Sequence, residues 1–228
     1  MSILRTIRQN TKKNQATVVA TERVGDGLRS IVVEPRHEVL GWSAGQAVAV
    51  VVDPEGAGLK DRWRHYTVRR LDPATGTLEL LVVERDDPAP AARWIAGLDV
   101  GSTFTFMGPG GSPVVETGAA SYLFVGDRTS LASIAAMVET IEAEPGPNPS
   151  AIEVLVATPN PERADLTTGT SGTVRWVEAD TAAEIRERLV DALPDEPPPD
   201  TRAYVTGEME MMRAVRTELG HRGFARRR

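Results

Sequence analysis

The hydrophobic pattern of this 228-residue chain changes once, near the Gly-Pro-Gly-Gly run at residues 108–111. Before this run, short segments rich in Val, Ile, Leu and Thr alternate with Gly, Pro and Asp turns, which is typical of an antiparallel barrel or sandwich. After it, apolar strand-like segments alternate with helical ones, which indicates a parallel sheet covered by helices. The sequence therefore predicts a β + α/β protein with two domains, residues 1–113 and 114–228.

Turn and capping signals divide each half into expected elements. In the first domain we expect strands at residues 16–24, 28–34, 46–53, 64–70, 77–85 and 102–107. A helix interrupts them, with Asp86 or Asp87 as its N-cap and Gly97 as its stop. In the second domain we expect strands at residues 121–125, 152–158, 173–177 and 202–206, and helices at residues 128–143, 181–193 and 209–219.

Composition excludes several kinds of chemistry. The chain has no cysteine and three histidines, so disulfides, thiol nucleophiles and iron–sulfur clusters are excluded and a metal site is not expected. Any redox chemistry would need a bound organic cofactor. A net charge of −6 argues against nucleic-acid binding. The longest apolar run, residues 47–52, is too short to span a bilayer, so we expect a cytoplasmic protein without stable membrane insertion.

Residues 64–69, Arg-His-Tyr-Thr-Val-Arg, form the sharpest local motif. On a strand, Arg64 and Tyr66 project to one side, and His65 and Thr67 project to the other. A Tyr ring offers a flat apolar wall to an isoalloxazine ring, and a small hydroxyl residue leaves room near the flavin N5. An Arg can bond a diphosphate bidentately. The same residues also fit an ordinary strand with a cross-strand Tyr and solvent-facing arginines.

A second candidate site lies where expected strands give way to helices. Gly126 and Asp127 follow one apolar strand, with Thr129 in the next turn, and Gly207 and Glu208 occupy the same kind of position later. Ligands collect at the carboxyl ends of strands in open α/β sheets, where helix N-terminal amides favour phosphate. Alternatively, each Gly only makes a tight turn, and the Asp caps a helix.

Five stretches in this order resemble the siderophore-interacting protein family, the FAD-containing ferric-siderophore reductases of the ferredoxin-reductase-like superfamily. They are the motif at residues 64–69, Pro-Ala-Ala-Arg-Trp at 90–94, the turn at 107–112, the Gly-Asp-Arg-Thr stretch that begins at 126, and Gly-Glu at 207–208. The resemblance extends over about residues 16–224. It implies a flavin-binding β-barrel followed by a nucleotide-binding parallel-sheet domain.

The resemblance also implies cofactors, a partner and site residues. FAD would lie in the first domain, NADPH or NADH in the second, and a ferric siderophore would accept the electrons. No side chain is expected to act as acid, base or metal ligand, because the flavin carries the chemistry. The implied cofactor-binding residues are Arg64, His65, Tyr66, Thr67, Ala91, Ala92, Gly126, Asp127, Thr129, Gly207 and Glu208.

The chain departs from the family pattern before residue 90, where Asp86 and Asp87 replace the usual His and glycines. Two carboxylates near a diphosphate would repel it unless they point away. Two alternatives therefore stay open: a related flavin oxidoreductase with another acceptor, and a non-enzymatic binding module that kept the fold.

Overall fold

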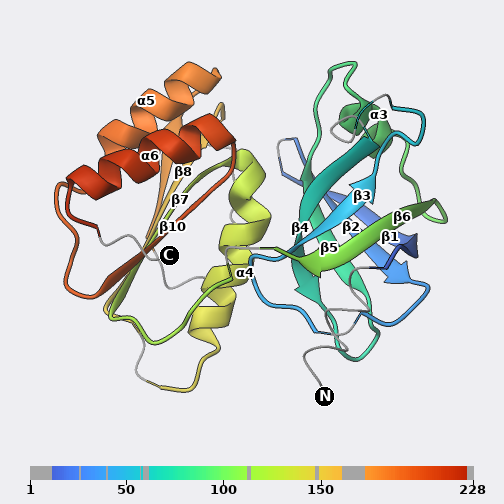
Figure 1. The fold of residues 1–228 in the computed structure, drawn as a ribbon, viewed down its shortest axis with the longest axis horizontal. Coiled ribbons are helices and arrows are strands. Elements are labelled where there is room, and N and C mark those ends of the chain that lie inside the picture. The colour runs from blue at the N-terminus through green and yellow to red at the C-terminus, as the bar shows by residue number, and fades with distance from the viewer. Residues whose placement is uncertain are drawn as a thin grey trace. The chain divides into compact units, whose positions relative to one another are not determined.

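The computed structural model describes residues 12–25, 27–39, 41–56, 58, 62–111, 114–146, 149–160 and 173–224. The chain divides into two compact units, Met1–Val114 and Val115–Arg228. Figure 1 shows strands of a barrel in the first unit and a sheet flanked by helices in the second. The predicted β + α/β class is confirmed.

The first unit is a closed barrel of six strands in the order β1-β2-β5-β4-β3-β6. Each pair of neighbours is antiparallel. Closure pairs every strand on both sides and leaves no edge open to association. The six predicted strands are all present, as β1 (Asn14–Gly25), β2 (Leu28–Pro35), β3 (Ala47–Val51), β4 (Trp63–Leu71), β5 (Leu78–Val83) and β6 (Thr103–Gly110).

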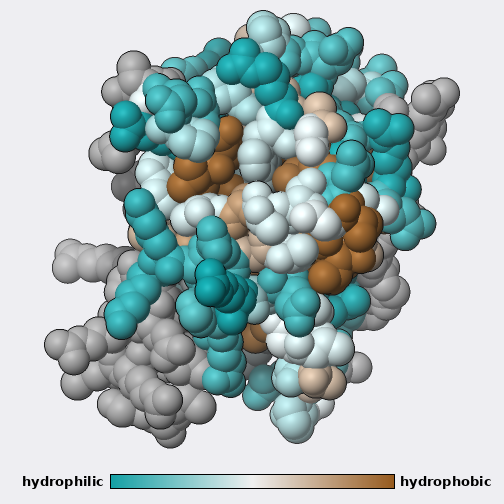
Figure 2. Space-filling model, turned by 90° about the vertical axis from the view of Figure 1, so that its right-hand side faces the viewer, coloured by the Kyte–Doolittle hydropathy of each residue, from teal (hydrophilic) through white to brown (hydrophobic). Residues whose placement is uncertain are grey.

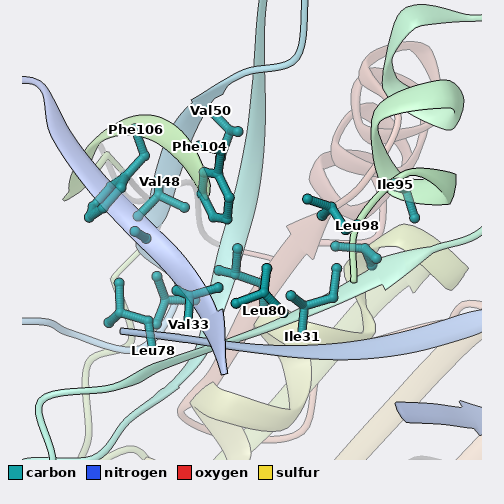
Figure 3. Packing of buried hydrophobic residues seen from close by; sticks show 14 of the residues in the cluster. Ile31, Val33, Val48, Val50, Leu78, Leu80, Ile95, Leu98, Phe104 and Phe106 are labelled. Atoms are coloured by element: carbon teal, nitrogen blue, oxygen red, sulfur yellow. The ribbon is translucent and has the colours of Figure 1, made fainter. Parts of the chain in front are cut away.

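Alternate residues of these strands fill the barrel, as the two-residue period of a strand requires. Ile31 and Leu80 are 0% exposed, and Phe106 is 1% exposed. Figure 3 shows this core, in which Ile95 and Leu98 come from the region of the single described barrel helix, α3 (Pro90–Ala96). The helical region thus contributes directly to the barrel interior.

The start of α3 differs from the prediction. Its N-cap is Ala89, no side chain bonds the first turn, and Pro90 opens the helix, where a missing N–H costs nothing. Oδ1 of Asp87 accepts the N–H of Ala89 at 2.9 Å, which closes a turn before the helix instead. The prediction that Asp86 or Asp87 caps this helix is therefore wrong.

The second unit is a parallel four-stranded sheet in the order β10-β7-β8-β9. The predicted strands and helices are all present. The expected helix from residue 128 begins with a 3-10 turn, η1, before α4. The elements are β7 (Ser121–Asp127), η1 (Arg128–Ser130), α4 (Leu131–Glu142), β8 (Ala151–Thr158), β9 (Thr173–Glu178), α5 (Ala182–Ala192), β10 (Thr201–Thr206) and α6 (Met209–His221).

Helices cover both faces of this sheet. Figure 1 shows α5 and α6 together on one face and α4 on the other. Every residue of β7 is buried, as expected for a central parallel strand. On the α5–α6 face the apolar core includes Leu123, Leu155, Leu189, Met211 and Val215. The carboxyl ends of β7 and β10 lie side by side, because Gly126 pairs with Thr206 in the sheet register.

The surface seen in Figure 2 is mainly polar, with apolar side chains in separate patches. Val19 and Val100 of the barrel unit are 40% and 65% exposed, and single exposed apolar residues of this kind are ordinary. Among the described residues, no helix combines the length and apolarity needed to cross a membrane.

Candidate functional site

Strand β4 turns Tyr66 toward the barrel and His65 toward solvent. Val68, which shares the side of Tyr66, is 0% exposed, whereas His65 is exposed. The register of β4 against β5 then shifts between Val68 and Arg70. At this irregularity Arg69 is only 3% exposed, so it is not one of the solvent-facing arginines of an ordinary strand.

The ring of Tyr66 stacks on Trp94 of α3, with ring centroids 5.3 Å apart and planes 24° apart. Trp94 in turn meets the edge of Phe104 at 5.3 Å and 88°. Burial raises the pKa of Tyr66 to about 12. A phenol is neutral at physiological pH even at its ordinary pKa of 10.0, and the ring of Tyr66 provides a flat, half-buried, apolar surface.

Two cations lie within electrostatic range of Tyr66. Arg64 and Arg85 both oppose the rise in its pKa, because a positive charge favours the phenolate. Nη1 of Arg64 donates to the carbonyl of Trp63 at 3.0 Å. Among the described residues no carboxylate pairs with either arginine. Arg85 lies outside the motif at residues 64–69, and only the folded arrangement brings it near Tyr66.

The N-terminus of α3 has no side-chain cap, in contrast to η1, α5 and α6, which Asp127, Thr181 and Glu208 cap. The amides of Ala91 and Ala92 belong to this uncapped first turn. Asp86 and Asp87 are both exposed, and the carboxylate of Asp87 is bonded to the preceding turn. The first turn of α3 thus carries no side-chain cap, and the Asp87 carboxylate lies next to it on the N–H of Ala89.

In the second unit the structure brings all five predicted residues together at the carboxyl ends of β7 and β10. Oδ1 of Asp127 accepts the N–H of Thr129 at 2.8 Å and the hydroxyl of the same residue at 2.5 Å. Oδ2 accepts the N–H of Glu208 at 2.9 Å. Asp127 is 4% exposed. Its buried carboxylate thus links the residues that follow β7 to those that follow β10 through these hydrogen bonds.

The two glycines allow this close packing. A Cβ at Gly126 would lie 2.5 Å from Oγ of Ser130 and 2.9 Å from the carbonyl oxygen of Thr206. Gly207 has φ +125°, and a Cβ there would lie 2.6 Å from Oδ2 of Asp127. The absence of a side chain at both glycines is therefore required by close contacts within the protein itself.

The helix-start amides near these glycines already have partners. Glu208 Oε2 accepts the N–H groups of Glu210 and Met211 at 2.7 Å and 3.0 Å, just as Asp127 occupies the N–H of Thr129. The alternative in which Asp127 caps a helix is thus confirmed. A phosphate would have to bind beside these amides or displace a carboxylate. The hydroxyl of Thr206, in contrast, is buried with no hydrogen-bond partner in the part of the chain that the structure describes.

No metal centre is formed by the described part of the chain. Over these residues, no group of three or more His, Asp or Glu side chains is placed to hold a metal ion.

Comparison with known proteins places both units in one family. The model of the siderophore-interacting FAD-binding domain matches residues 21–113. The model of the siderophore-interacting protein matches residues 119–228. Together the two models match residues 21–228 except for residues 114–118.

Two curated relatives are longer than this chain. The mycobactin import ATP-binding/permease protein IrtA of Mycobacterium tuberculosis is 29% identical over 172 residues, which is 73% of this chain and 19% of that protein. The uncharacterized protein Rv2895c of the same species is 29% identical over 153 residues, 65% of this chain and 52% of that protein. The chain therefore spans about a fifth and about half of these two relatives.

Solved structures share the fold at low identity. A siderophore utilization protein from T. fusca has a TM-score of 0.75 at 21% identity, covering 94% of this chain and 88% of its own. SipS, the siderophore-interacting protein from Aeromonas hydrophila, has a TM-score of 0.74 at 22% identity, covering 92% and 86%. The ferredoxin reductase in carbazole 1,9a-dioxygenase has a TM-score of 0.73 at 18% identity, covering 94% and 63%. The chain belongs to the siderophore-interacting protein family, and its fold is ferredoxin-reductase-like.

Proposed function

We propose that this protein is a cytoplasmic, FAD-dependent NAD(P)H oxidoreductase that reduces a ferric siderophore and so releases Fe(II). The observation that carries the proposal is the flat, neutral ring of Tyr66, held by Trp94 and flanked by Arg64 and Arg85, with which no carboxylate of the described residues pairs. A planar aromatic wall beside positive charge suits a molecule that joins an isoalloxazine ring to a diphosphate. The match to a siderophore-interacting FAD-binding domain supports the same ligand.

The barrel residues would divide the work of holding FAD. Tyr66 would contact the ring, and Thr67 and His65 would line the neighbouring side of β4. Arg64, together with Arg85, would neutralise the diphosphate. The amides of Ala91 and Ala92, in a first turn without a side-chain cap, would donate to phosphate oxygens.

The second unit would hold the reduced nicotinamide nucleotide at the strand ends. Asp127 and Glu208 would act there mainly by fixing the backbone at Gly126 and Gly207, since their carboxylates are engaged within the protein. Thr129 would border the same site. The hydroxyl of Thr206, at the end of β10, has no hydrogen-bond partner among the described residues, and a ligand that reached it would supply one.

When bound, the flavin would supply the redox chemistry, accepting a hydride and passing on single electrons. The protein's own part would be placement and exclusion of water. Fe(III) is a substrate, and its reduction weakens binding by the hard oxygen ligands of a siderophore, which releases the metal.

Flavin binding is the first test. The purified chain would be loaded with FAD, passed through gel filtration and examined for the visible absorption of bound flavin. Arg64→Gln should weaken retention, whereas Arg70→Gln, an exposed arginine on the same strand, should not. Folded protein that emerges colourless would contradict the reductase and favour a binding module.

The acceptor is tested separately. FAD-loaded protein would be mixed under anaerobic conditions with NADH or NADPH, then with a ferric siderophore and an Fe(II)-trapping chelator. Appearance of the Fe(II) chelate at the rate of flavin reoxidation supports the proposal. Flavin that is reduced by the nucleotide but not reoxidised by any ferric siderophore would point to another acceptor.

A further inference from the structure

Four aromatic rings form a column that leads from the barrel interior to Tyr66. Phe106 and Phe104 have ring centroids 6.4 Å apart, and Phe104, Trp94 and Tyr66 follow at steps of 5.3 Å. Exposure rises along the column. Phe106 is 1% exposed and Phe104 is 7% exposed, whereas Trp94 and Tyr66 are only partly buried. The column therefore begins in the core and ends at the Tyr66 ring.

Trp94 is a fixed member of this column. The next residue, Ile95, and nearby Leu98 are 4% and 3% exposed, and Figure 3 shows both beside the barrel core. Arg29 of β2 donates through Nη1 to the carbonyl of Ile95 at 2.9 Å and through Nη2 to the carbonyl of Leu98. These contacts tie the backbone next to Trp94 to the barrel, and the indole packs against the rings of Tyr66 and Phe104.

A fixed indole restricts what Tyr66 can do. The near-parallel stack covers one face of the Tyr66 ring and sets its plane. A second planar group can then join only at the remaining face or edge. Aromatic pairs prefer offset-stacked or edge-to-face arrangements. One more planar ring on the remaining face of Tyr66 would therefore extend the column.

We propose that Trp94 is a positioning residue for the flavin, which acts by holding the ring of Tyr66 in the plane on which the isoalloxazine stacks. The inference rests on the proposed function, because it takes FAD as the ligand at Tyr66. It assigns to Trp94 a role apart from the phosphate contacts of α3.

A double-mutant cycle tests this role. Trp94→Leu should weaken FAD binding by about three- to tenfold, the size expected from a lost aromatic stack. Tyr66→Leu should weaken it at least as much. The double variant should bind no more weakly than Tyr66→Leu alone, because Trp94 acts through Tyr66. The visible circular dichroism of bound flavin should change in Trp94→Leu and return toward the wild-type form in Trp94→Phe.

Controls separate this role from simple packing. Trp176→Leu removes a partly buried indole from β9 of the other unit and should leave FAD binding unchanged. If Trp94→Leu does not fold, Trp94→Met keeps an unbranched apolar side chain without a ring and enters the same cycle. Wild-type-like affinity and dichroism in the Leu or Met variant, or additive losses in the double variant, would overturn the inference alone. A wild-type chain that binds no FAD would overturn it together with the proposed function.

Discussion

Oδ2 of Asp127 accepts the backbone N–H of Glu208 at 2.9 Å, and this bond joins the end of β7 to the start of α6. The other carboxylate oxygen holds the N–H of Thr129. Asp127→Asn keeps the shape but turns an NH₂ group toward one of these two donors. We expect the variant to lose about 1–3 kcal/mol of stability against urea, because a buried donor loses its acceptor. Asp99→Asn, whose side chain is 90% exposed, should unfold like the wild type, and equal midpoints for both variants would contradict this role.

Gly207 is expected to tolerate no Cβ. Its φ is +125°, and an added Cβ would lie 2.6 Å from Oδ2 of Asp127 and 2.8 Å from Cε of Met211. Gly207→Ala should therefore cost more than about 2 kcal/mol in the free energy of unfolding. Gly146→Ala is the matched control, because its φ is +148° with nothing within 4 Å of the added carbon. If the two substitutions cost the same, backbone strain and not crowding explains the glycine.

The placement of the second-unit residues at the carboxyl ends of strands could be predicted from the sequence, because it depends on local apolar runs and the residues that follow them. Each strand is a short apolar run, and parallel strands bring their carboxyl ends to one edge, so residues at those ends were expected along that edge. The sequence could not show how those neighbours bond. Asp127 and Glu208 are 81 residues apart, and their contact depends on which strands are adjacent in the sheet.

The barrel site was predictable only in part. The alternation of β4 indicated the side of Tyr66, but the pairing with Trp94 and the proximity of Arg85 depend on how α3 docks and how β4 and β5 pair. The start of α3 was predicted wrongly because the carboxylate of Asp87 can either cap a helix or accept a backbone N–H within a turn. It bonds the N–H of Ala89 in a turn, and this competes with capping the helix.

Arg29 should control the stability of α3. Besides the two α3-region carbonyls, its Nε donates to Oγ1 of Thr21 at 2.6 Å. Arg29→Met keeps the apolar stem but removes these donors, so amide hydrogen exchange in α3 should accelerate by about tenfold or more. Arg23→Met is the control, because Arg23 pairs with the same Glu84 as Arg29 but is 79% exposed. Exposed pairs contribute about 0–1 kcal/mol, and similar acceleration in both variants would show that the carbonyl contacts are unimportant.

The buried phenol of Tyr66 predicts a stability loss at high pH. Its pKa is raised from an ordinary 10.0 to about 12, mainly by burial. Below pH 10 the phenol is neutral in both the folded and unfolded states. Between pH 10 and 12 only the unfolded state ionises, so stability falls as pH rises, by up to about 2 kcal/mol. Tyr66→Phe should flatten this part of the pH profile of urea unfolding, and parallel profiles for the two proteins would contradict the burial effect.

Thr206 and Thr201 lie on the same strand, β10, and should respond oppositely to the same substitution. The hydroxyl of Thr206 is buried without a partner among the described residues, whereas that of Thr201 donates to the carbonyl of Pro198 at 2.6 Å. An unsatisfied buried hydroxyl costs about 1–3 kcal/mol, so Thr206→Val should leave the ligand-free protein equally or more stable, and Thr201→Val should destabilise it. Thermal unfolding of both variants checks this. If Thr206→Val lowers the midpoint as much as Thr201→Val, the Thr206 hydroxyl has a partner in the folded protein, and a ligand is not needed to account for it.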